Sequence, residues 1–249
     1  MLRTAAEIGD LADFLQRLGI RTMIIGVIRR ADYLLPSAYA EAVRSGSTTR
    51  LRPPFVERRA HLLDHRLLLE QWSAAFEEIR LIPYLETDKS DPAAVPRRFL
   101  QACGVSATAT ADWPQSDRLS RPGLSATAVE VLRRISPTLG LAQWQSGAER
   151  NRLIEFLAAR HPGQGVRLTS SARRALDEHG WIQTGIDTSP AAYGSGWQDW
   201  RDTEAAPMAP PAQPSDELVA ETLRAATAAG FGHRPIAGRA LGLLRRLRR

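Results

Sequence analysis

Apolar residues recur along the chain with two different periods, and the change between them separates helices from strands. In residues 5–18 they fall at every third or fourth position, which predicts an amphipathic helix that Gly19 ends. Residues 21–28 form an almost continuous apolar run, typical of a parallel strand that is buried on both faces. A second run, residues 79–84, predicts a parallel neighbour, because helical sequence lies between the two runs.

The helices between and after these strands have recognisable ends. Asp32 and Gly46 bracket the first crossover helix, although Pro36 also suits a helix start. A polar, basic loop follows at residues 45–54, and residues 61–76 predict one long helix. Further helices are expected near residues 125–135, 148–160 and 170–179. The predicted fold is therefore α/β: a small, mostly parallel sheet flanked by helices, with a helical C-terminal half.

A proline- and alanine-rich stretch, residues 204–214, divides the chain by composition. It predicts an extended linker between an α/β domain, residues 1–203, and a basic helical tail, residues 215–249. Within the tail, residues 215–229 begin with a Ser-Asp pair that is typical of a helix start. At residues 238–249, leucines alternate with arginines, so this end can dock on the core or make a weak peripheral contact with an anionic membrane.

Composition narrows the class of protein and its expected location. The 249 residues carry a net charge of +6, and Lys89 is the one lysine, so the positive charge is almost entirely arginine. Arginine suits bidentate phosphate contacts, but a GC-rich genome gives the same bias. No signature of a specific nucleic-acid binder is present. Cys103 has no cysteine to pair with, and no signal-peptide or membrane-spanning pattern is found, which favours the cytoplasm.

Two residues near the first strand are candidate phosphate ligands. Arg29 follows the strand directly, at the carboxyl edge where open α/β sheets bind their ligands. Ser37 is expected near the amino terminus of the next helix, where free N–H groups and the helix dipole attract anions. A guanidinium, a hydroxyl and a helix end together would form a phosphate site.

The eight-residue spacing of Arg29 and Ser37 resembles the 3′-phosphate-binding segment of the bacterial sulfotransferases that use 3′-phosphoadenylyl sulfate. The similarity continues through the helical residues 64–76 to the second strand, whose last residue, Tyr84, would by resemblance contact the adenine. The resemblance implies a P-loop-type sulfotransferase fold and a nucleotide sulfate donor, with adenosine 3′,5′-bisphosphate as its product. It also implies a hydroxyl or amine acceptor, for example on a glycan.

The chain departs from this family where the transferred group would bind. The family holds the 5′-phosphosulfate in a Gly-rich loop with a lysine, whereas Lys89 has no glycine near it. The family's catalytic base lies before the Arg–Ser segment, where the acidic residues are Glu7, Asp10 and Asp13, all within the first predicted helix, so no catalytic residue is assigned. The sequence predicts a sulfotransferase-like protein that is incomplete or inactive as an enzyme, unless a further βα unit precedes it. A non-catalytic scaffold on a degenerate nucleotide-binding fold and a binder of anionic surfaces are the alternatives.

Other groupings of reactive residues favour structural interpretations. His61 and His65 have the spacing of metal ligands on one helix, but no third ligand accompanies them, and no metal is expected. Tyr193 and its neighbouring tryptophans lie around a Gly-rich stretch, which is more typical of a tied-down loop than of a stacking site. Ser189 lacks the Gly-x-Ser-x-Gly elbow of a nucleophilic serine.

Overall fold

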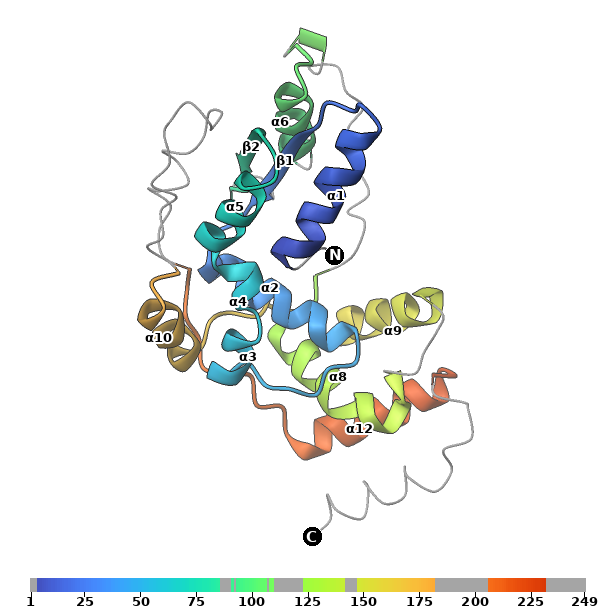
Figure 1. Cartoon of the computed structure of the whole chain (residues 1–249). Helices are drawn as coiled ribbons and strands as arrows, with labels where there is room; N and C mark the ends of the chain where they lie inside the picture. Colours follow the sequence, from blue (N-terminus) through green and yellow to red (C-terminus); the bar gives the residue numbers. More distant parts are fainter. Residues whose placement is uncertain are drawn as a thin grey trace. The chain divides into compact units, whose positions relative to one another are not determined.

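The computed structural model describes residues 4–85, 91, 93–106, 108–109, 123–141, 147–181 and 206–231. The chain forms two compact units that alternate along the sequence (Figure 1). The first comprises residues 1–34, 56–119 and 174–205, and the second residues 35–55, 120–173 and 206–249. This division differs from the predicted one into residues 1–203 and 215–249. Lys89, Ser189, the aromatic loop near Tyr193 and residues 238–249 lie outside the described residues.

The first unit is built on two parallel strands, β1 (Met23–Ile28) and β2 (Glu78–Pro83). Their register places Met23 beside Glu78 and Ile28 beside Pro83, so both strands end at the same edge. Gly26 permits close packing here, because a Cβ at this position would lie 2.9 Å from the Leu81 side chain opposite. The small parallel sheet and the α/β class are thus confirmed.

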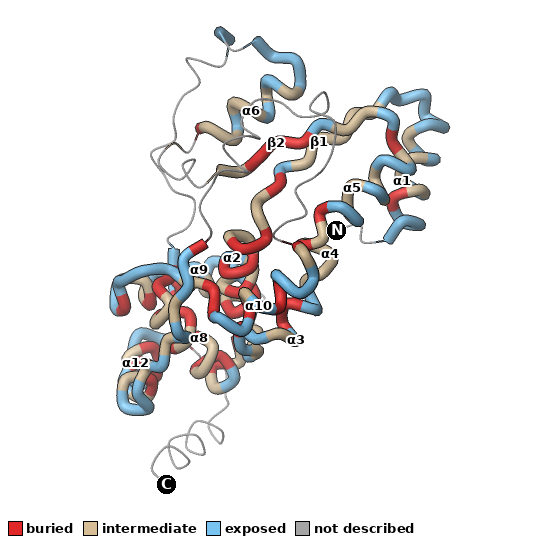
Figure 2. Tube along the Cα trace, turned by 90° about the vertical axis from the view of Figure 1, so that its left-hand side faces the viewer, coloured by how far each residue is buried: buried red, intermediate tan, exposed pale blue. Residues whose placement is uncertain are grey.

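Three helices cover these strands. α5 (His65–Ser73) and α6 (Ala94–Ala102) both contact β2, and α1 (Ala5–Arg17) contacts α5. Figure 2 shows the strands between α6 on one side and α1 with α5 on the other. Ile28 and Leu81 form the buried centre of the sheet, and the partly buried Leu69 of α5 packs against them.

The sheet is less buried than its apolar sequence predicts. Val27 in β1 is 48% exposed, so the expected burial of both faces is wrong at this position. On α1, Ile8 is buried, but Phe14 and Leu18 of the same predicted apolar stripe are exposed. Among the described residues the sheet has two strands, so it offers only a narrow apolar surface on which helices can pack.

A single long helix over residues 61–76 is also wrong, because the chain breaks at Asp64. α4 (Ala60–Leu63) ends there and α5 begins one residue later. The Asp64 backbone is not helical, and its carboxylate accepts a hydrogen bond from the N–H of Leu67 at 3.0 Å. The side chain thus caps α5 instead of continuing α4.

The crossover helix α2 (Ala31–Arg44) starts earlier than Pro36 suggests. The N–H of Leu34 already donates to the carbonyl of Arg30 at 2.8 Å, and Asp32 lies inside the first turn instead of capping it. The predicted end is confirmed, since Gly46 has a φ of +95° and its N–H donates to Val43. A short helix, α3 (Pro53–Glu57), begins at the end of the loop that was expected at residues 45–54.

The second unit is helical. α8 (Ala126–Leu139) contacts both α9 (Gly147–Arg160) and α12 (Asp216–Ala228), and α10 (Ser170–Glu178) begins in this unit. These elements confirm the predicted helical C-terminal half. α8 turns its apolar face inward, with these residues buried: Val129, Val131, Leu132, Ile135 and Leu139.

Buried polar groups join α8, α9 and α12. The Ser125 hydroxyl accepts from the N–H of Ala128, which caps α8, and it donates to the carbonyl of His161 at 2.6 Å. The His161 ring lies 3.0 Å from the Thr222 hydroxyl of α12, and burial lowers the pKa of this imidazole. The predicted cap of α12 is confirmed, since the Ser215 hydroxyl accepts from the N–H of Leu218.

The described part of the proline-rich stretch, residues 206–214, is non-helical, as predicted, but it packs on the second unit. Ala206 is buried, and the N–H of Ala209 donates to the carbonyl of Leu168 at 2.9 Å. Met208 forms a parallel bridge with the same residue. This segment is therefore part of a folded unit and does not act as a free spacer.

His65 makes the stability of the first unit depend on pH. Burial lowers the pKa of its imidazole from 6.5 to about 4, so the unfolded chain takes up a proton at a higher pH than the folded chain does. The free energy of unfolding should therefore fall by about 2 kcal/mol between pH 7 and pH 5 from this group alone. Chemical denaturation of the wild type and of His65→Gln checks this, because the variant should lose that share of the decline. Identical pH profiles would contradict it.

Candidate functional site

Arg29 and Tyr84 meet at the carboxyl edge of the sheet. They directly follow β1 and β2, and the N–H of Tyr84 donates to the carbonyl of Ile28 at 2.7 Å. The Arg29 guanidinium lies 5.0 Å from the centre of the Tyr84 ring, within the range of a cation–π contact. Two of the residues singled out from the sequence are thus brought together, and both are partly exposed.

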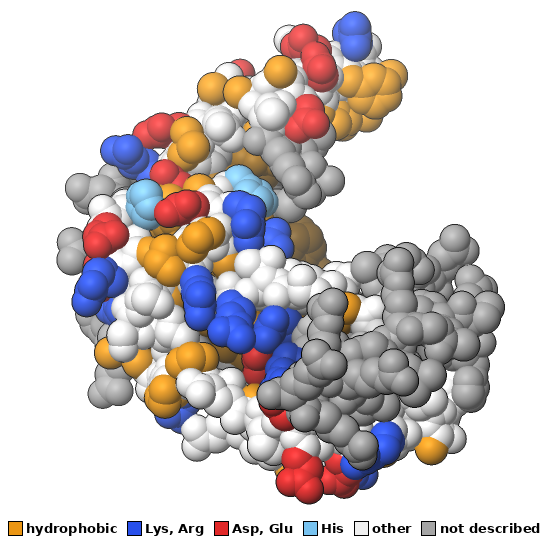
Figure 3. Space-filling model, turned by 90° about the horizontal axis from the view of Figure 1, so that it is seen from below, with side chains coloured by type: hydrophobic (Ala, Val, Ile, Leu, Met, Phe, Trp, Pro, Cys, Tyr) orange, Lys and Arg blue, Asp and Glu red, His pale blue; other side chains and the backbone are white. Residues whose placement is uncertain are grey.

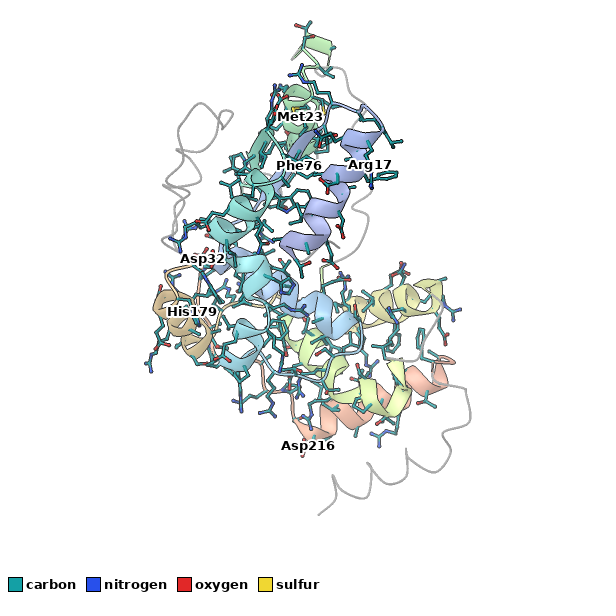
Figure 4. All side chains as sticks on the ribbon, viewed as in Figure 1. Arg17, Met23, Asp32, Phe76, His179 and Asp216 are labelled. Carbon is teal, nitrogen blue, oxygen red and sulfur yellow. The ribbon has the colours of Figure 1, made fainter. Side chains whose placement is uncertain are left out.

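The neighbouring Arg30 has a structural partner. Its guanidinium binds the Asp32 carboxylate through two hydrogen bonds, of 3.2 Å from Nε and 2.8 Å from Nη2. Asp32 is fully buried in the first turn of α2, and its side chain is labelled in Figure 4. The Arg30 guanidinium also lies 5.7 Å from the Tyr33 ring. This pair fixes the turn between β1 and α2, and the preceding residue, Arg29, contacts the ring of Tyr84 instead.

A second guanidinium reaches the same edge from α6. Arg98 donates from Nη2 to the carbonyl of Pro83, the last residue of β2, at 3.0 Å. This residue was not among those singled out from the sequence. The signal that could have found it is the Arg97-Arg98 pair in the middle of the short amphipathic helix that follows the second strand.

Asp91 supplies negative charge near Arg98, but it already has a partner. Its carboxylate accepts from the Arg97 guanidinium and from the N–H of Ala93. The hydrogen bond from Arg97 holds the pKa of Asp91 below its usual range. Two pairs of opposite charge, Asp91 with Arg97 and Asp32 with Arg30, thus lie near this edge together with the guanidinium groups of Arg29 and Arg98.

Ser37 lies apart from the first turn where it was expected. Because α2 begins at Ala31, Ser37 is the seventh residue of the helix, and its own N–H falls within the helical ladder. It is exposed and belongs to the second unit, whereas Arg29 belongs to the first. The prediction that it lies beside free N–H groups is therefore wrong.

The described residues contain no group of three or more side chains able to hold a metal ion. His65 is buried and opens α5, whereas His61 is partly exposed in α4, so the break at Asp64 places the two on different helices. No helix within the described ranges is long and apolar enough to cross a membrane. Cys103 is exposed at the end of α6.

No protein-family model, curated protein or solved structure matches this chain. The assignment of the site therefore depends on its own geometry. That geometry consists of two guanidinium groups and a phenol ring at the carboxyl ends of two parallel strands. Such a set can bind a planar ring and an anionic group together.

Loss of Asp32 should weaken the first unit. Asp32→Ala leaves the guanidinium of Arg30 largely buried without its carboxylate, so the free energy of unfolding should fall by about 3 kcal/mol. Asp13→Ala, which removes an exposed carboxylate from α1, is the matched control and should change stability by less than about 0.5 kcal/mol. Urea denaturation of both variants measures the difference. Equal stabilities would show that the Arg30–Asp32 pair does not hold this turn.

Proposed function

We propose that the first unit binds an adenine nucleotide that carries a 3′-phosphate, with adenosine 3′,5′-bisphosphate as its simplest ligand. The observation that carries the proposal is the contact of Arg29 with Tyr84 at the carboxyl ends of β1 and β2. Parallel sheets bind ligands at this edge, because the loops that follow the strands converge there.

The roles of the side chains follow from their chemistry. Arg29 offers a rigid fork of N–H donors that matches a phosphate, and Arg98 adds a second positive charge at the same edge. The Tyr84 ring offers an aromatic face on which adenine can stack. Because the ring already lies against the Arg29 guanidinium, both parts of the nucleotide could be held with little reorganisation of side chains.

This set of residues supports binding better than sulfuryl transfer. Transfer needs cationic donors around the 5′-phosphosulfate and a general base near the acceptor. The residues at this edge serve one phosphate and one ring, and the one lysine of the sequence, Lys89, has no Gly-rich loop around it. The proposed function is therefore that of a sulfotransferase-like nucleotide-binding protein, with no catalytic residue assigned.

Arg29→Ala should lower the affinity for adenosine 3′,5′-bisphosphate about ten- to a hundredfold, since it removes a charge-assisted contact with phosphate. Affinity for adenosine 5′-monophosphate, which lacks the 3′-phosphate, should change far less. Isothermal titration calorimetry measures both ligands.

Arg21→Ala is the matched control. Arg21 precedes β1, its side chain is 94% exposed, and its ion pair with Glu78 spans 3.6 Å. Its replacement by Ala therefore removes the same charge at the opposite end of the sheet. This variant should bind like the wild type. The proposal fails if Arg29→Ala and Arg21→Ala change the affinity for the bisphosphate equally. It also fails if neither the wild type nor any variant binds the bisphosphate at millimolar concentration.

A further inference from the structure

The second unit contains a cavity of about 800 Å³. Arg29, Tyr84 and Arg98 of the proposed nucleotide site do not line it. This volume is in the range of small-molecule sites. Three parts of the unit line it: α2 with the loop after it, the region from α8 to the first turn of α10, and residues 210–214 with the start of α12. Figure 4 labels Asp216, which opens α12.

The lining is rich in arginine. The cavity is bordered by the following four arginines: Arg50, Arg52, Arg134 and Arg167. Arginines are also prominent on the face shown in Figure 3, where every blue side chain is an arginine because the one lysine lies outside the described residues.

The acidic residues of the lining are already paired. Asp216 accepts from Arg134, which also donates to the carbonyl of Pro214 at 2.9 Å. Glu130 accepts from the neighbouring Arg133 at 2.7 Å. These carboxylates therefore do not neutralise the remaining arginines of the cavity.

Three of the lining arginines have no carboxylate within ion-pair distance among the residues that the structure describes: Arg50, Arg52 and Arg167. These three side chains give the cavity its net positive charge. Arg50 and Arg52 belong to the loop after α2, and Arg167 precedes α10. Cations from two separate segments thus border one cavity, an arrangement that suits an anion held between them.

Neutral donors and an apolar wall complete the lining. Burial raises the pKa of Tyr39 to about 12, so its phenol keeps its proton and can donate a hydrogen bond. Ser170 and Ser171 add hydroxyl groups. Leu51 and the prolines of residues 210–214 form apolar surface, which a bare inorganic ion would not use.

We propose that this cavity binds a small organic ester of phosphate or sulfate, with the tetrahedral oxyanion on the arginines and an apolar body against Leu51 and the prolines. The site is independent of the nucleotide site, because all of its lining residues belong to the second unit. Phosphate and sulfate esters share the charge and geometry that the arginines recognise, and the experiment distinguishes them.

The probes are 2-naphthyl phosphate, 2-naphthyl sulfate and the neutral 2-naphthol, titrated into the full chain by calorimetry. At least one ester should bind, and 2-naphthol should bind more than tenfold more weakly than that ester. Arg50→Gln and Arg167→Gln should each lower the affinity for it about ten- to a hundredfold. A preference for one ester identifies the source of the oxyanion.

Arg224→Gln is the matched control, because Arg224 is an exposed arginine of α12 that does not line the cavity. It should bind the esters like the wild type. Thermal unfolding of each variant checks that it is folded. If Arg50→Gln or Arg167→Gln does not fold, Arg52→Gln takes its place.

Equal losses in Arg224→Gln and Arg167→Gln would mean general charge attraction and would overturn the proposal. It is also overturned if neither ester binds, or if Arg29→Ala alone weakens binding. That last result would place the ester at the carboxyl edge of the sheet. It would overturn the proposal for the cavity but not the proposal for the nucleotide site.

Discussion

The parallel pairing of β1 with β2 is the constraint on which the first unit depends. Its last hydrogen bond, from the N–H of Tyr84 to the carbonyl of Ile28, brings together two chain segments that are more than 50 residues apart in the sequence. The contact between Arg29 and Tyr84 at the carboxyl edge follows from this register. A shift by one residue would turn Tyr84 to the other face of the sheet and away from Arg29.

A second constraint acts on the arginines, which are numerous enough to serve two purposes. Some are fixed in ion pairs that hold the fold together, such as Arg30 with Asp32 in the first unit and Arg134 with Asp216 in the second. Others border the cavity of the second unit and form no ion pair among the described residues, namely Arg50, Arg52 and Arg167. This division, and not the overall net charge, shows where an anion can bind. The two candidate sites belong to separate units, so each can be tested without the other.

Much of the architecture could be predicted from the sequence, because local signals and the fold agree. The apolar runs locate both strands, and Gly19, Gly46 and Ser215 mark helix ends where they were expected. The predictions fail where two local signals compete. Pro36 suits a helix start, but α2 begins at Ala31, so Pro36 lies inside the helix and Ser37 lies beyond its first turn.

Non-local features were beyond the reach of pattern analysis. Arg98 becomes part of the candidate site only because α6 packs against β2, which no sequence spacing specifies. The alternation of the two units along the chain is equally invisible, since residues 206–214 have the composition of a linker but pack beside Leu168. The choice of a 3′-phosphate nucleotide as the proposed ligand comes from the expected resemblance to sulfotransferases, whereas the contact of Arg29 with Tyr84 comes from the structure.

The most direct test of the account is hydrogen–deuterium exchange of the full chain with and without saturating adenosine 3′,5′-bisphosphate. If the nucleotide binds at the carboxyl edge, amide exchange should slow in peptides that cover residues 27–33 and 82–85, the two segments that leave the strands. Exchange should not change in residues 206–214 of the second unit. Unchanged exchange at both strand ends, with protection in the second unit instead, would contradict a nucleotide site at the carboxyl edge of the sheet.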